Sequence, residues 1–250
     1  MIRLLKYELK RLIINKFFLG LLIISAFYSY QVMGGDIILG VANTAPFSGW
    51  SYGEYLAKEL PILLVTLLFF VSFLYSRQEK SVQTLTKATP INPFKFQMLR
   101  YGTIIIGFLL ISVIPIGYSM WFYKVNFHFT DFESLVFPTV ITLLPAMLFV
   151  LGLGVLGGRF NQGIIFVFMV AVILLSYFQL PYVIDLLGGS FLERYPASLD
   201  IVEPAFTIPV SVLIGKAIYC LSGLIMMILF TGKKESAKPL NKGYMKRQRV

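Results

Sequence analysis

Residues that could do acid–base or metal chemistry are few in this chain and stand apart. His128 is the single histidine, and it lies in a short polar segment beside Asp131 and Glu133. One histidine cannot form the paired-histidine zinc site of an H-E-x-x-H helix. Cys220 is the single cysteine, so these 250 residues form no internal disulfide and no cysteine metal cluster. The pattern favours a solvated loop histidine and a small apolar thiol over a catalytic or metal site.

One glycine pattern resembles a nucleotide-binding motif but lacks its context. The sequence G-L-G-V-L-G at 152–157 ends an apolar run. Dinucleotide binding requires this pattern between a strand and a helix. No G-x-x-x-x-G-K-[ST] phosphate loop occurs in the sequence either. We therefore expect no bound nucleotide or other cofactor in this chain, and we predict that Gly154 and Gly158 let two membrane helices approach closely.

The composition indicates a membrane protein built only from helices. Hydrophobic residues make up 57% of the chain and charged residues 14%, whereas soluble domains carry about 25% charged residues. Runs of about 20 apolar residues are long enough to cross a bilayer. We predict an all-α, polytopic fold with one transmembrane domain over 1–250 and six transmembrane helices: 17–33, 60–76, 101–123, 135–157, 163–184 and 208–231.

The charges divide the connecting segments into two groups. Eighteen of the 22 basic residues, but only three of the 12 acidic residues, lie in 1–16, 77–100, 158–162 and 232–250. The positive-inside rule places these segments, and both termini, in the cytoplasm of a multi-pass cell-membrane protein. The bases flank the membrane runs without the interleaved aromatic residues of single-strand binding, so we expect no nucleic-acid partner.

Four segments outside the spans have recognisable patterns. Residues 1–16 place Leu5, Leu9, Leu12 and Ile13 at helical spacing among basic residues, which predicts an amphipathic interface helix on anionic lipid. The tail 232–250 reads as a basic cytoplasmic anchor. Residues 34–59 read as an outer loop whose Trp50, Tyr52 and Tyr55 favour the interface. In 185–207, glycines and prolines interrupt apolar stretches, which is typical of short broken helices.

The cytoplasmic loop 77–100 is the organising segment. A short helix is predicted from Ser81 to Ala88, and Pro90 then forces Thr89 out of helical geometry. Asn92-Pro93 is typical of an N-cap followed by proline at the first helical position, so the next helix is expected to begin there. A soluble partner protein could bind this pair of helices and the proline-containing break between them.

Ionisable residues are scarce within the predicted spans. The acids fall outside them, which argues against a proton relay of buried carboxylates. Lys216 is the exception. Either it lines a polar cavity, or the last span begins near Gly215 and Lys216 snorkels to the outer interface. We favour snorkelling.

With these parts assembled, the chain resembles an ABC-2 type transporter permease subunit along nearly its whole length. The resemblance rests on the basic N-terminal helix LLKYELKRLIINKFF, six spans, the interrupted segment before the last span, and a loop of the form E-x(n)-L-x(3)-T-P-I-x-P. In that family the loop resembles a coupling helix that seats in a groove of a separate ATPase. The resemblance therefore implies a cytoplasmic coupling helix whose coupling residues are Glu79, Gln83, Leu85, Thr89 and Pro90.

The resemblance also implies a function and partners. The chain would be a transport subunit and not an enzyme, with ATP and Mg²⁺ bound by two copies of a partner ATPase. A second permease subunit, identical or homologous, would complete a bacterial exporter of an amphipathic peptide, lipid or hydrophobic drug. An intramembrane enzyme and an ATPase-independent channel or sensor subunit are the alternatives, although the spans contain no histidine–serine or metal constellation for the enzyme.

Overall fold

The computed structural model describes residues 2–76, 79, 93–199 and 201–231. The described chain is helical and contains no strand. Its elements, in order, are α1 (Ile2–Ile13), α2 (Lys16–Val32), η1 (Met33–Ile37), α3 (Gly49–Leu74), α5 (Pro93–Phe127), η2 (Phe132–Leu135), α6 (Val136–Phe160), α7 (Gln162–Leu175), α8 (Gly189–Arg194), η3 (Pro196–Leu199) and α9 (Val210–Thr231).

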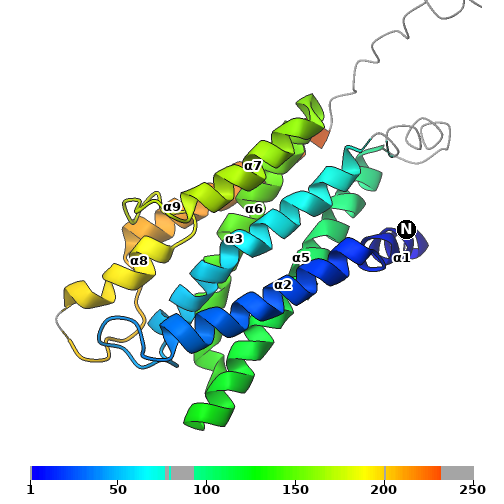
Figure 1. The fold of residues 1–250 in the computed structure, drawn as a ribbon. Helices are drawn as coiled ribbons and strands as arrows, with labels where there is room; N and C mark the ends of the chain where they lie inside the picture. Colours follow the sequence, from blue (N-terminus) through cyan, green and yellow to red (C-terminus); the bar gives the residue numbers. More distant parts are fainter. Residues whose placement is uncertain (1, 77–78, 80–92, 200, 232–250) are drawn as a thin grey trace, which may run out of the picture.

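The long helices form one bundle, with α1 at one end and α8 at the other (Figure 1). Five of the described helical segments are long and apolar enough to cross a membrane: Lys16–Ile37, Gly49–Leu74, Phe94–Phe127, Phe132–Phe160 and Val210–Leu229. This confirms a polytopic, helical membrane protein. The sixth predicted span, 163–184, corresponds to α7, whose 14 residues reach only about 21 Å at 1.5 Å per residue. The polar turn after Leu175 ends α7 before it is as long as the other spans.

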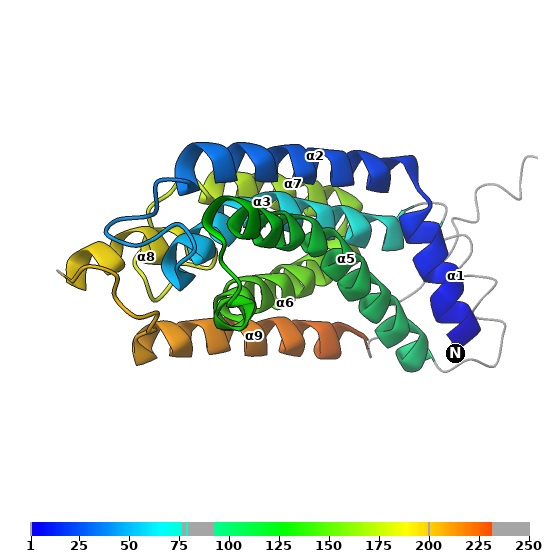
Figure 2. The ribbon, with the colours of Figure 1, turned by 90° about the horizontal axis from the view of Figure 1, so that it is seen from below.

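The amphipathic N-terminal helix is present as α1. Leu5, Leu9, Leu12 and Ile13 are half-buried, while Lys6 and Lys10 are exposed. Asn15 separates α1 from α2, because its backbone is extended and its side chain accepts a hydrogen bond from the Phe17 N–H at 3.1 Å. As a result, α1 lies at a steep angle to α2, across the end of the bundle (Figure 2).

α3 is the central helix, and its start corrects the sequence reading. In its most apolar window 72% of residues are buried, against 28% for both α2 and α9. α3 begins at Gly49 rather than near Leu60, so the end of the predicted outer loop 34–59 is helical. Trp50, Tyr52 and Tyr55 are fully buried among other side chains of the protein.

The early start of α3 also brings acids into a spanning helix. Glu54 and Glu59 lie in the candidate span Gly49–Leu74, and they are 3% and 0% exposed. The expectation that acids avoid the spans was therefore wrong. A hydropathy scale assumes that each side chain in a span contacts lipid. In α3, Glu54 and Glu59 instead contact other parts of the protein. Neither carboxylate oxygen of Glu59 has a hydrogen-bond partner among the described residues.

Glycines set the closest helix approaches in the core. A Cβ on Gly154 would come 2.9 Å from the Leu68 side chain of α3, and one on Gly158 would overlap the Tyr75 ring. This confirms the predicted close approach, here between α6 and α3. Gly152 and Gly223 bring α6 and α9 together backbone to backbone, since a Cβ on Gly152 would lie 2.7 Å from the Gly223 carbonyl oxygen.

The interrupted segment 185–207 folds as predicted into short helices, α8 and η3. Asp185 begins it, because its carboxylate accepts hydrogen bonds from the Gly188 and Ser190 N–H groups, each at 2.9 Å. Trp50 then ties the segment to α3, since its indole N–H donates to the Pro204 carbonyl at 3.0 Å. These contacts fix the position of α8 at the end of the bundle opposite α1.

Candidate functional site

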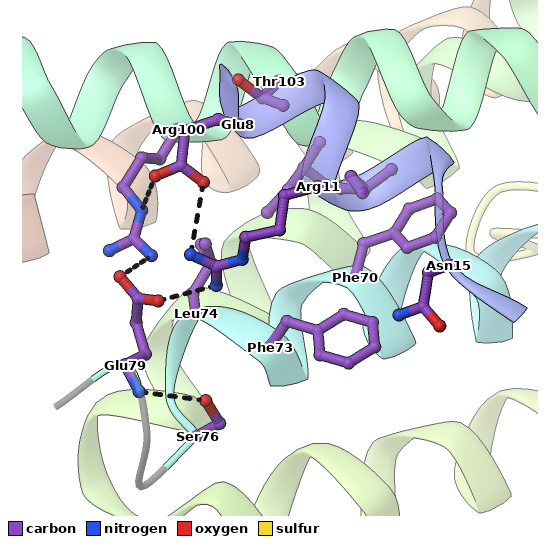
Figure 3. A pocket seen from close by; sticks show the side chains of 12 residues that line it. Glu8, Arg11, Asn15, Phe70, Phe73, Leu74, Ser76, Glu79, Arg100 and Thr103 are labelled. Atoms are coloured by element: carbon purple, nitrogen blue, oxygen red, sulfur yellow. Dashed lines mark hydrogen bonds and ion pairs between the residues drawn. The ribbon is translucent and has the colours of Figure 1, made fainter. Parts of the chain in front are cut away.

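Glu79 is the centre of an ion cluster that joins three parts of the chain (Figure 3). Its Oε2 accepts a hydrogen bond from the Arg11 guanidinium of α1 at 2.6 Å. Its Oε1 lies 2.5 Å from a guanidinium nitrogen of Arg100 on α5. The Glu79 N–H also donates to the Ser76 hydroxyl at 3.3 Å, just past the end of α3. A single carboxylate thus joins α1, the end of α3 and α5.

Glu8 completes the cluster. Its Oε2 lies 3.9 Å from Arg11, and its Oε1 lies 3.9 Å from the Arg100 Nε. Two carboxylates and two guanidinium groups give a cluster with no net charge. The side chains of Glu79 and Arg100 are only 5% and 3% exposed, whereas that of Arg11 is 41% exposed. The Glu79–Arg100 pair is therefore the buried part of the cluster, and Arg11 faces the surrounding solvent.

Local sequence explains why these side chains meet. Glu8 and Arg11 are three residues apart on α1, so they share one helix face. Arg100 lies on α5 two turns after its first residue, Pro93. That helix begins where the Asn92-Pro93 pattern predicted. The Arg100 guanidinium also lies over the Phe96 ring, 5.4 Å from its centroid, which orients it toward Glu79.

The charges of this cluster reinforce one another. Burial disfavours the charged form of Arg11, but its hydrogen bond to Glu79 and the nearby charge of Glu8 outweigh burial and raise the pKa of Arg11. Arg11 therefore stays charged at every physiological pH. Arg11 therefore provides a permanent positive charge beside Glu79.

A cavity of about 370 Å³ adjoins the cluster. Phe70, Phe73 and Leu74 of α3 form its apolar wall, while the four charged residues and Asn15 form its polar wall. No group of three histidine, cysteine, aspartate or glutamate side chains in the described part of the chain could hold a metal ion. The arrangement joins helix ends mechanically and presents no nucleophile–base pair.

The predicted coupling residues can be placed only in part. Glu79 lies at the centre of the cluster, whereas Gln83, Leu85, Thr89 and Pro90 lie outside the described residues, as does the predicted tail 232–250. Sequence reasoning missed Glu8, Arg11 and Arg100 as partners of Glu79. One sequence feature could have pointed to these partners. Glu8 lies three residues before Arg11 on an amphipathic helix whose other charged residues are basic.

The structure agrees with the prediction for His128 and differs from the prediction for Lys216. His128 is exposed, at the loop after α5, as expected. Lys216 was expected to snorkel to the outer interface, but it is only 5% exposed. Its ammonium group donates to the Leu186 carbonyl at 2.8 Å. α9 begins at Val210 and packs on residues 183–187. The Lys216 ammonium group therefore donates to a protein carbonyl instead of to water at the outer interface.

We expect the substitution Lys216→Met to destabilise the protein. It would leave the buried Leu186 carbonyl without its donor, and an unsatisfied buried group costs about 1–3 kcal/mol. The melting temperature in detergent measures this, with Lys124→Met, at an exposed position near the end of α5, as control. Equal melting temperatures of the two variants would show that the contact with Leu186 contributes nothing.

Comparison with known proteins adds no relative: no family model, no curated protein and no solved structure matches this chain.

Proposed function

We propose that this protein is the permease subunit of an ATP-driven transporter of the ABC-2 type. A separate ATPase would dock on loop 77–100, bind ATP and Mg²⁺, and supply the energy. The observation that carries the proposal is the Glu79 cluster. It ties the first part of the loop to α1 and α5 through a buried ion pair and a 2.6 Å hydrogen bond.

The cluster would let the loop work as a lever. Residues 77–100 are joined covalently to α3 and α5, and Glu79 adds a third attachment, to α1. A force on the loop would then act on three helices together instead of bending a free loop. Coupling requires two arrangements of such a packed unit, with the partner favouring one of them.

The surface of the bundle is suited to a membrane-partitioning cargo and to a second subunit. α9 carries exposed apolar side chains along its length, including Ile214, Ile218, Leu221 and Ile225. These side chains would contact lipid or a second permease subunit. We propose export of an amphipathic peptide, lipid or hydrophobic drug from a bacterial cell membrane, by a complex with two permease and two ATPase subunits.

The substitution Leu85→Asp tests the docking site. If Leu85 is an apolar anchor in a groove of the ATPase, its loss should cost about 2 kcal/mol, a roughly 30-fold loss of affinity. The tagged full chain would be purified gently from native membranes. The measurement is the nucleotide-dependent ATPase activity that co-purifies with wild type and with the variant.

Leu39→Asp is the matched control, because Leu39 is an exposed leucine, 87% accessible, at the other end of the bundle. It should retain the ATPase. If Leu85→Asp retains the ATPase and transports normally, loop 77–100 is not the docking site. If wild type transports with no ATPase bound, the chain is a channel or sensor subunit instead.

Topology is tested by cysteine labelling in a Cys220→Ser background. Both described ends of the chain, α1 and the last turn of α9, lie at the same end of the bundle (Figures 1 and 2). We expect Ser198→Cys, exposed in η3, to be labelled from outside intact cells. Lys10→Cys, exposed on α1, should require permeabilised cells. The reverse pattern would place the termini outside and exclude a cytoplasmic ATPase partner.

A further inference from the structure

A second cavity, of about 410 Å³, lies at the end of the bundle opposite the ion cluster. α2, η1, α3, the segment after α7, and α8 all contribute to its lining. Four acidic residues and one basic residue line it: Asp36, Glu54, Asp185, Glu193 and Lys58. The lining therefore has three more acidic than basic side chains, in a chain whose net charge is +10.

Two of the four acids are already engaged. Asp36 forms an ion pair with Lys58 at 2.8 Å. Asp185 accepts hydrogen bonds from the backbone of the turn into α8. The carboxylates of Asp36 and Asp185 therefore already have partners within the protein.

Glu54 is not satisfied in this way. Its side chain is 5% exposed, and its Oε2 has no hydrogen-bond partner among the described residues. Its other oxygen is 4.0 Å from Lys58, whose ammonium group is closer to Asp36. Ionising a buried carboxyl group that is only partly paired is costly, and a positive charge that reaches it removes much of this cost. Glu193 is exposed at the edge of the same cavity and adds to the negative potential there.

The rest of the lining selects the kind of cation. Tyr28, Tyr177 and Phe178 line the cavity beside the acids. Aromatic faces attract organic ammonium groups. The described residues include no group of three side chains suited to hold a metal ion. A small inorganic ion would find few ligands here, whereas an ammonium group on an apolar body would use both the acids and the rings.

We propose that this cavity binds an organic cation, an ammonium group carried on an apolar body, with the Glu54 carboxylate as its counter-ion. Tyr28, Tyr177 and Phe178 contact the apolar body, and Glu193 draws the cation toward the cavity. This site does not depend on the proposed transport activity, because the isolated chain contains all of it.

The test uses the full chain in nanodiscs of zwitterionic lipid, without any ATPase. Binding of benzyltrimethylammonium is measured by saturation-transfer NMR and by the rise in melting temperature. Its neutral carbon isostere, neopentylbenzene, reports binding that depends on shape alone. We expect the cation to bind wild type, and Glu54→Gln to weaken binding at least tenfold, since glutamine keeps the size of the side chain and removes its charge.

Glu133→Gln, an exposed acid in η2 outside the cavity, is the matched control and should bind as wild type does. Glu193→Gln changes an exposed side chain and should weaken binding about threefold, which decides the matter if Glu54→Gln does not purify as a folded protein. The proposal is overturned if wild type does not bind the cation, if the isostere binds equally well, or if neither cavity variant differs from Glu133→Gln.

Discussion

Replacing Glu79 with glutamine is expected to lower the free energy of unfolding by about 3–5 kcal/mol. Removing one partner of a buried ion pair leaves the other charge uncompensated. Here that charge is Arg100, which is 3% exposed and whose remaining acidic neighbour, Glu8, is 3.9 Å away. Thermal unfolding of the purified chain measures the change.

The matched control for Glu79→Gln is Asp36→Asn. The Asp36–Lys58 pair is short, 2.8 Å, but its side chains are 59% and 35% exposed. Exposed pairs contribute about 0–1 kcal/mol, so this variant should unfold near the wild-type temperature. Similar losses in both variants would contradict a special role for the Glu79 cluster.

Glu79→Gln also separates docking from coupling. Loop 77–100 would still present Leu85 to the ATPase, so the ATPase should co-purify while transport is lost. Leu85→Asp, in contrast, should lose both. If Glu79→Gln keeps its fold and transports at the wild-type rate, the cluster stabilises the bundle without transmitting force.

Replacing Gly223 is expected to destabilise the protein through overpacking. A Cβ at Gly223 would overlap the Leu148 carbonyl oxygen of α6, which is backbone and cannot rotate away. Overpacking ordinarily costs about 1–3 kcal/mol, and we expect Gly223→Ala to reach the upper end of that range. Gly223→Leu should force α6 and α9 apart, so that no monodisperse protein is recovered in size-exclusion chromatography.

Gly117→Ala in α5 provides the control. No atom lies within 4 Å of a Cβ built there, and alanine is about 1 kcal/mol better than glycine within a helix. This variant should melt at or above the wild-type temperature. If Gly223→Ala behaves in the same way, the close approach of α6 and α9 is not needed for the fold.

The sequence by itself determined features that depend on neighbouring residues. Apolar length and low charge indicated a helical membrane protein. The spacing of Leu5, Leu9 and Leu12 gave the amphipathic face of α1, and the proline at residue 93 gave the first residue of α5. Such features follow from helical periodicity and backbone restriction, which act within one or two turns.

The tertiary structure alone decided where charges can be buried. From the sequence we predicted that the second span begins near Leu60, because Glu54, Lys58 and Glu59 are charged residues that are unfavourable in lipid. α3 nevertheless begins at Gly49, capped by the Ser48 side chain, and both glutamates are buried within the protein. Lys216 is likewise buried, because its ammonium group donates a hydrogen bond to the Leu186 carbonyl.

The partners of Glu79 also could not be predicted from the sequence. Arg11 is 68 residues away along the chain, and the sequence offers 22 basic residues. Which of them pairs with Glu79 depends on how α1 turns at Asn15 and where α5 begins. The approach of distant helices sets that choice, because the energy of a buried ion pair depends on distance and surroundings that no local pattern encodes.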